Sequence, residues 1–132
     1  MKALDTNILV RFLVNDDEKQ AGAVYKKFKQ AEAEKELLFV PILVVLETLW
    51  VLESVYEIPR NEILDALDTL LALPALKFEL QPTLRNFVNS SKGNLLDLSD
   101  MLIAFSAKAS GCESIITFDK KAAKSEWFEL LE

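Results

Sequence analysis

Short apolar runs of strand length alternate with longer segments of helical length along this chain, and no other feature constrains the fold as strongly. Alternation of this kind is typical of α/β domains, in which helices join parallel strands. It predicts an α/β domain with a mostly parallel sheet. The predicted strands are residues 2–5, 37–40, 76–79, 114–117 and 127–130, and the predicted helices are residues 8–14, 16–35, 42–56, 59–71, 82–93 and 97–110.

The size and composition of the chain indicate one packed domain that covers residues 1–132. Half of the residues are apolar and only three are glycine, so a compact core is expected rather than disorder. Cys112 is the single cysteine, which excludes a disulfide framework and a cysteine-based metal site. The longest apolar run, residues 39–46, is far shorter than the roughly 20 residues of a membrane-spanning helix. We therefore expect a cytoplasmic protein with no membrane association.

Four acids, Asp5, Glu47, Asp100 and Asp119, interrupt or end apolar stretches. A carboxylate is rarely left in apolar surroundings without a positive partner. The chain has no histidine, and most of its fifteen Lys and Arg residues lie outside these four segments. A bound divalent cation is therefore the expected partner. Asp5 and Asp119 also follow predicted strands, whose carboxyl ends form the ligand-binding edge of a parallel sheet.

Each acid also has an ordinary structural explanation, and the sequence leaves these alternatives open. Glu47 could be a carboxylate at the rim of a helix, paired with a distant Lys or Arg. Asp100 lies in the first turn of its helix, where acids complement the helix dipole, although we expect Asp97 to cap this helix. Asp5 and Asp119 could be turn residues. The polar residues beside them, which either support the carboxylates or bond the turns, are Thr6, Asn7 and Thr117.

Carboxylate ligands favour Mg²⁺ or Mn²⁺ over zinc. A cation held in this way lowers the pKa of a bound water, orients it in line with a phosphodiester and stabilises the departing oxygen. No histidine is needed as a base. The absence of histidine excludes ribonucleases and triad hydrolases that depend on it.

The net charge of −6 argues against general affinity for nucleic acid. It does not exclude a phosphate substrate bridged by a metal ion, because several of the 21 acids would then be neutralised. The basic residues also gather in two groups, which are Lys26, Lys27 and Lys29, and Lys120, Lys121 and Lys124.

Four segments together resemble the PIN domain, and specifically the VapC-type toxin ribonucleases of bacteria and archaea. They are "LDTNILVRFL", "VPILVVLETLWVLE", "DLSDMLIAFSAKASGC" and "IITFDKKA", and their order and spacing agree over essentially the whole chain. The resemblance implies a three-layer α/β/α sandwich with a mostly parallel, roughly five-stranded sheet. It also implies an endoribonuclease dependent on Mg²⁺ or Mn²⁺, a homodimer, and a cognate antitoxin protein whose tail covers the acidic pocket.

By position, Asp5, Glu47 and Asp100 match the acids that hold the metal in this family, and Asp119 matches a fourth, more variable acid. Thr6, Asn7 and Thr117 match the polar supporting positions. Arg11 could face the pocket or the RNA, or form a salt bridge with a local acid such as Asp16.

Two other functions remain possible from the sequence. One is a non-catalytic PIN-fold module that binds RNA or protein. Against it, clustered carboxylates repel one another, and a module that catalyses no reaction has no use for this unfavourable energy. The other is a phosphoryl-transfer enzyme with an aspartyl nucleophile. The segment "DTN" lacks the second Asp that haloacid-dehalogenase-like phosphatases carry two residues on, and receiver domains need an acid pair after the first strand.

Overall fold

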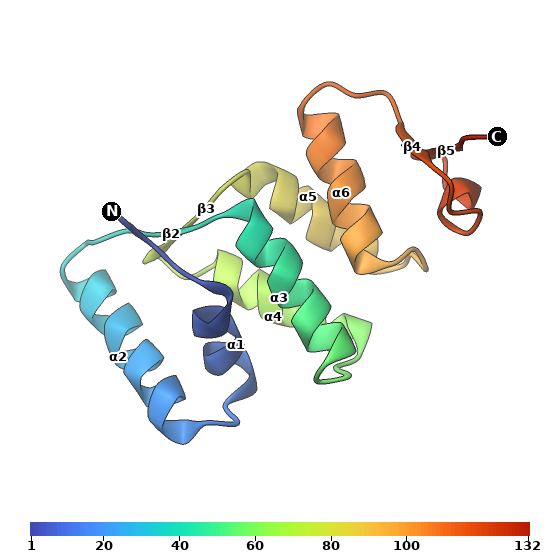
Figure 1. The fold of residues 1–132 in the computed structure, drawn as a ribbon. Coiled ribbons are helices and arrows are strands. Elements are labelled where there is room, and N and C mark those ends of the chain that lie inside the picture. Colours follow the sequence, from blue (N-terminus) through green and yellow to red (C-terminus); the bar gives the residue numbers. More distant parts are fainter. The chain divides into compact units, whose positions relative to one another are not determined.

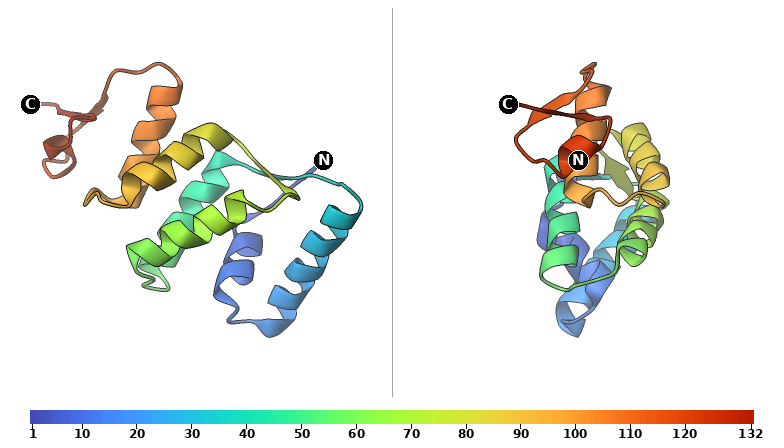
Figure 2. Two further views of the ribbon diagram at one scale, coloured as in Figure 1. Left: turned by 180° about the vertical axis from the view of Figure 1, so that it is seen from behind. Right: turned by 90° about the vertical axis from the view of Figure 1, so that its right-hand side faces the viewer.

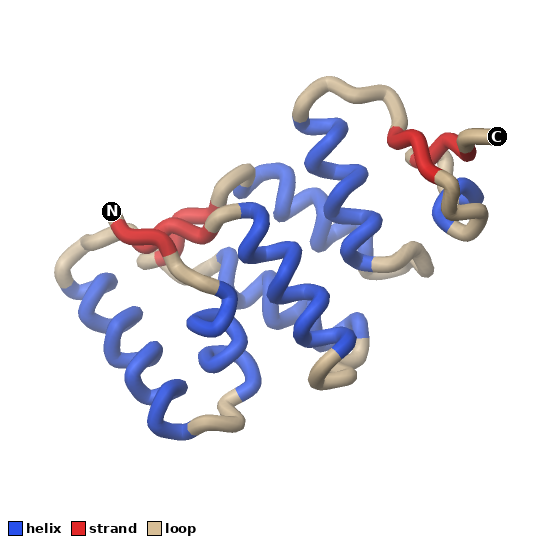
Figure 3. The backbone as a smooth tube through the Cα atoms, in the orientation of Figure 1, coloured by secondary structure: helices blue, strands red, loops and turns tan.

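The computed structural model describes all 132 residues, and the chain divides into two compact units, Met1–Gln81 and Pro82–Glu132 (Figure 1). Helices dominate both units and the strands are short (Figure 3). The first unit contains β1 (Lys2–Ala3), α1 (Thr6–Val14), α2 (Glu18–Ala33), β2 (Leu38–Val40), α3 (Ile42–Ser54), α4 (Arg60–Leu71) and β3 (Leu76–Phe78). The second contains α5 (Gln81–Ser91), α6 (Leu98–Ala109), β4 (Ile115–Thr117), the 3₁₀ helix η1 (Ala122–Lys124) and β5 (Phe128–Leu130).

All strand pairs are parallel, which confirms the predicted α/β class. The strands of the first unit are arranged in the order β1-β2-β3, with Ala3 opposite Phe39 and Phe39 opposite Lys77. In the second unit β4 pairs with β5, with Ile116 opposite Glu129. The expected five strands are therefore present, but their ladders form a three-stranded and a two-stranded sheet rather than one continuous sheet. The strands are only two or three residues long, and each of them pairs only with strands of its own unit.

The core of the first unit forms where α1, α3 and α4 meet. The apolar side chains of Leu9, Val45, Leu49 and Ile63 are almost completely buried there. They help to line an internal cavity of only about 10 Å³, so the three helices are closely packed. Helix α2 lies beside α1, as both views of Figure 2 show, because residues such as Phe28 project from one face of α2 onto Phe12 of α1.

The core of the second unit includes a chain of aromatic rings. The ring of Phe105 on α6 contacts Phe87 of α5 edge-on, with 6.3 Å between centroids, and also contacts Trp127 at 5.6 Å. The ammonium group of Lys108 lies over the Trp127 indole, 4.6 Å from its centroid. These contacts attach the segment before β5 to the two helices.

Most predicted boundaries agree with the structure to within two residues, and the exceptions have local causes. Thr6 and Asn7, predicted as a turn, are the first residues of α1, because Asp5 caps the helix. Pro59, predicted inside the first turn of α4, is its N-cap. The 3₁₀ helix η1 was not predicted, since three residues carry no hydrophobic period. No helix is long and apolar enough to cross a membrane.

Helix α3, which carries Glu47, obtains its N-terminal cap from a residue distant in sequence. Its N-cap position is Pro41, which offers no side-chain hydrogen bond. The carboxylate of Glu79 accepts a hydrogen bond from the backbone N–H of Ile42 at 2.8 Å instead, and the backbone N–H of Glu79 donates to the carbonyl of Val40. Glu79 follows β3, so this contact fixes the start of α3 against the sheet.

Replacing Glu79 by alanine should therefore destabilise the protein by about 1 kcal/mol, because the N–H of Ile42 loses its acceptor. Urea denaturation followed by circular dichroism measures this free energy of unfolding. Glu79→Gln is the matched control, because its amide oxygen can still accept the bond, and it should lose less. Equal losses in both variants would show that the hydrogen bond is not the stabilising feature.

Candidate functional site

The four predicted metal ligands divide equally between the two units. Asp5 and Glu47 belong to the first unit, and Asp100 and Asp119 to the second. All four lie at or near the start of a helix or turn, or on an exposed helical face. Their environments are described here one unit at a time.

Asp5 is held where β1 passes into α1. Its Oδ1 atom accepts a hydrogen bond of 2.8 Å from the backbone N–H of Thr6. The preceding residue, Leu4, is buried and donates its N–H to the carbonyl of Phe39, which extends the pairing with β2. Asp5 itself is exposed, and its second carboxylate oxygen has no hydrogen bond. Asp5, for which the sequence also allowed an ordinary turn position, is the N-cap of α1, and the cap uses only one of its two carboxylate oxygens.

Glu47 lies on the exposed face of α3, where the structure corrects an expectation. The apolar residues one turn away, Leu43 and Trp50, are not core residues but are 74% and 56% exposed. Glu47 is exposed as well and forms no ion pair. The surrounding sequence suggested burial because it is apolar on several sides, whereas only Val45, Thr48, Leu49 and Leu52 of this helix face the core. The distant Lys or Arg considered as a partner of Glu47 is absent.

Asp119 is fixed by the turn that follows β4. Its Oδ1 atom accepts hydrogen bonds from the backbone N–H groups of Lys121, at 2.9 Å, and Ala122, at 3.3 Å. Its own N–H donates to the hydroxyl of Thr117 at 3.0 Å. Thr117 thus positions the backbone of Asp119 through a turn bond, which is one of the two roles considered for it. The Oδ2 atom of Asp119 is left without a hydrogen bond.

Asp100 lies in the first turn of α6 and is partly buried. Asp97 caps this helix, as predicted, by accepting a 3.3 Å hydrogen bond from the N–H of Asp100. Burial raises the pKa of the Asp100 carboxyl above its usual value, and the negative charges of Asp97 and Asp119 raise it further. Asp100 and Asp119, which are 19 residues apart in sequence, are thus brought close enough to repel each other.

This repulsion is the structural observation that bears on a bound cation. Asp97 and Asp119 disfavour the ionisation of Asp100, one oxygen of Asp119 has no hydrogen bond, and none of these acids forms an ion pair, so they are donors that suit a hard divalent ion. Neither unit alone gathers three or more acidic or cysteine side chains as a metal-binding group. The grouping of all four acids stays a prediction.

The remaining predicted residues have distinct environments. Thr6 is buried, and its backbone N–H supports the carboxylate of Asp5. Asn7 is exposed and helps to line a shallow pocket of about 340 Å³ on α1 and α2.

Arg11 forms the salt bridge that the sequence offered as an alternative to an RNA contact. Its guanidinium lies 3.2 Å from Asp16, and it also donates to Gln20 and to the hydroxyl of Tyr56. Tyr56 in turn donates to Asp16 at 2.9 Å. Arg11 therefore links α1, the start of α2 and the loop after α3.

The raised pKa of Asp100 predicts how stability depends on pH. Between its usual value of 3.8 and its raised value, the folded chain binds more protons than the unfolded chain, so stability falls as pH rises through that window. In metal-free buffer at pH 7, Asp100→Asn should raise the melting temperature by up to about 2 °C, as expected for a partly exposed residue. The gain should shrink below pH 4.

Asp68→Asn, an exposed acid on α4, is the matched control for this measurement and should not show the same pH-dependent gain. Calorimetry from pH 3.5 to 7 measures the melting temperatures of both variants and of the unaltered protein. A melting temperature that Asp100→Asn leaves unchanged at pH 7 would contradict this prediction.

Comparison of the sequence with known proteins identifies the family of the chain. The model of the PIN domain family matches residues 2–126, which include all four acids. The chain is 29% identical over 124 residues to the VapC ribonuclease of Aquifex aeolicus (strain VF5), and this match covers 94% of the chain and 91% of the relative. The resemblance carried by the four sequence segments is thereby confirmed, and the chain belongs to the PIN domain family.

Proposed function

We propose that the protein is an endoribonuclease that depends on a divalent metal ion and acts as the toxin of a toxin–antitoxin pair. The observation that carries this proposal is the match to a VapC ribonuclease along nearly the entire length of both chains. The intact acids support it, because Asp119 acts electrostatically on Asp100 and neither acid forms an ion pair. The match of the PIN family model to residues 2–126 spans both units, so we propose that residues 1–132 act as one domain.

We propose that Asp5, Glu47, Asp100 and Asp119 hold Mg²⁺ or Mn²⁺. When bound, the ion would polarise the phosphate, activate water for attack on phosphorus and neutralise the departing oxygen. The chain's own contribution is to present free carboxylate oxygens from fixed positions. One oxygen of Asp5 and one of Asp119 are engaged by backbone N–H groups, which leaves the other oxygen of each available.

The supporting residues act on these carboxylates through the backbone. Thr117 holds the turn that orients Asp119, and the N–H of Thr6 holds Asp5. We propose that Asn7, which is exposed one helical position beyond Thr6, contacts the substrate or its hydration shell. Contacts of this kind around the metal ligands keep the ligating carboxylates in place while charge develops during the reaction.

The proposal implies three partners. The substrate is RNA, and we propose that the protein acts on it in the cytoplasm. A cognate antitoxin would cover the acidic residues and suppress cleavage. We also propose a homodimer.

The alternative of a non-catalytic binding module has no observation in its favour. A module without chemistry would gain nothing from an Asp100 carboxyl whose pKa is raised by burial and by the charges of Asp97 and Asp119.

Purified protein should cleave a mixed RNA pool in the presence of Mn²⁺ or Mg²⁺ and should stop when the metal is chelated. Asp100→Asn should lower the rate by about a hundredfold or more, since changes to outer-shell partners alone commonly cost 10- to 100-fold. Gel analysis of end-labelled RNA measures the rate. Asp68→Asn controls for the loss of one exposed negative charge.

If Asp100→Asn cleaved RNA as fast as the unaltered protein, Asp100 would not be a residue of the active site. Cleavage that persists in chelator would instead point to a reaction without metal.

Metal binding should also stabilise the folded chain. At a hundredfold excess over the dissociation constant, the gain is about 2.7 kcal/mol, because only the folded state assembles the ligands. Thermal denaturation with and without millimolar Mn²⁺ measures it, and Asp100→Asn should reduce the gain. A melting temperature that does not respond to Mn²⁺ would contradict the proposed metal site.

A further inference from the structure

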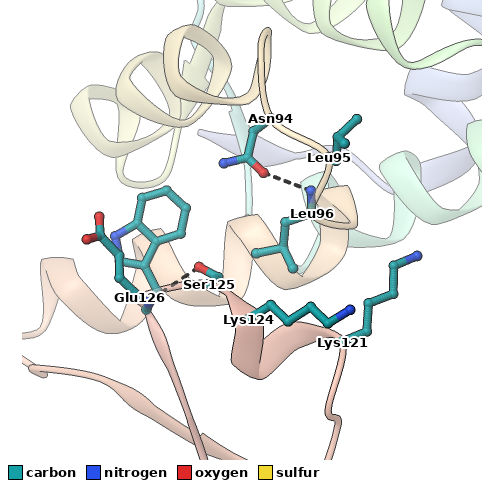
Figure 4. Close-up of a pocket in the computed structure, with 8 residues that line it drawn as sticks. Asn94, Leu95, Leu96, Lys121, Lys124, Ser125 and Glu126 are labelled. Carbon is teal, nitrogen blue, oxygen red and sulfur yellow. Dashed lines mark hydrogen bonds between the residues drawn. The ribbon is translucent and has the colours of Figure 1, made fainter.

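The second unit contains an open pocket of about 420 Å³ that none of the four proposed metal ligands lines (Figure 4). One wall is the loop between α5 and α6, which includes Asn94, Leu95 and Leu96. The other wall is the segment from Lys121 to Trp127, which includes η1. The amide oxygen of Asn94 accepts a 2.7 Å hydrogen bond from the N–H of Leu96, so the loop is held in a defined shape.

Two cations face this pocket without partners. Lys121 and Lys124 both line it, both are exposed, and neither forms an ion pair. Glu126 is the acidic residue of the lining. Figure 4 shows its carboxylate on one side of the pocket and the two ammonium groups on the other. In a chain of net charge −6, this pocket therefore offers an uncommon local site for an anion.

The pocket is joined to two of the proposed ligands through short stretches of backbone. Lys121 donates its N–H to the carboxylate of Asp119, so the same turn orients the acid and carries the lysine. On the opposite wall, Leu96 directly precedes Asp97, the cap of the helix on which Asp100 lies. An extended ligand with its reacting group at Asp100 and Asp119 would therefore reach the pocket with a neighbouring group.

The rest of the lining suits a nucleotide better than an inorganic ion. Leu95 is 93% exposed at the rim, and Trp127 contributes part of an indole that Phe105 and Lys108 hold in place. Apolar surface beside ammonium groups matches a base linked to a phosphate.

We propose that this pocket binds the RNA strand next to the scissile phosphate, with Lys121 and Lys124 each contacting a neighbouring phosphate and Leu95 contacting a base. The inference rests on the proposed ribonuclease function and adds a substrate subsite to it. It assigns the two lysines a role in binding and none in the chemical step.

The test is fluorescence anisotropy of a labelled single-stranded RNA pool in chelator, so that nothing is cleaved, at several salt concentrations. Lys121→Gln/Lys124→Gln should bind RNA about tenfold more weakly, and the slope of log affinity against log salt should fall by about 1.4, as expected for two lost phosphate contacts. Glu126→Gln should bind more tightly, because it removes the negative charge of the lining.

The matched control is Lys19→Gln/Lys26→Gln, which removes the same charge from exposed positions on α2, and its affinity should change by less than about twofold. Unchanged melting temperatures would establish that all variants are folded. The proposal is overturned if the pocket variant and the control bind RNA equally, or if Glu126→Gln weakens binding.

Cleavage by the unaltered protein separates this failure from failure of the function. Metal-dependent cleavage together with equal binding by the two lysine variants would reject the pocket alone. No cleavage and no RNA binding by the unaltered protein would reject both proposals. The pocket with Lys121 and Lys124 would then be tested as a binding site for a partner protein.

Discussion

Every helix N-terminus leaves backbone N–H groups without partners, and this chain satisfies them largely with carboxylates. Asp5 caps α1, Asp17 caps α2, Glu79 caps α3 and Asp97 caps α6. Asp5 follows β1 and Glu79 follows β3, so these two caps place negative charge at the carboxyl ends of the strands, the edge where ligands bind in such folds. The capping requirement therefore shapes both the fold and the candidate site.

The same arrangement explains why the acids can serve two purposes. A carboxylate has two oxygens, and at Asp5 and Asp119 backbone N–H groups engage only one of them. The engaged oxygen holds the side chain in place, and the other remains available to a cation. Asp100 differs because its carboxylate has no such hydrogen bond and lies partly buried near Asp97 and Asp119. It is therefore the acid for which ionisation is most costly and for which a cation would provide most relief.

Sequence patterns predicted the elements well where the pattern was long or ended at a strong cap. The apolar period of α4 predicted that helix, and the cap at Asp17 predicted the start of α2. Helix α6 ends just before Gly111, which has a φ of 90°, as predicted. The cap supplied by Glu79 could not be predicted, because it joins residues 37 positions apart. The exposed position of Glu47, beside the exposed Leu43 and Trp50, could not be predicted either, because α3 is apolar on more than one face.

By itself the sequence determined the α/β class, the order of strands and helices, and the four acids with their family resemblance. These depend on local periodicity and on residue type at fixed spacing, which the chain carries without folding. Tertiary structure alone decided that Arg11 is engaged by Asp16 and Tyr56, that Asp119 acts on Asp100, and that Lys121 and Lys124 share a pocket with the loop at Asn94. Apart from the local pair of Arg11 and Asp16, these contacts join residues that are distant in sequence, and packing sets the distances between them.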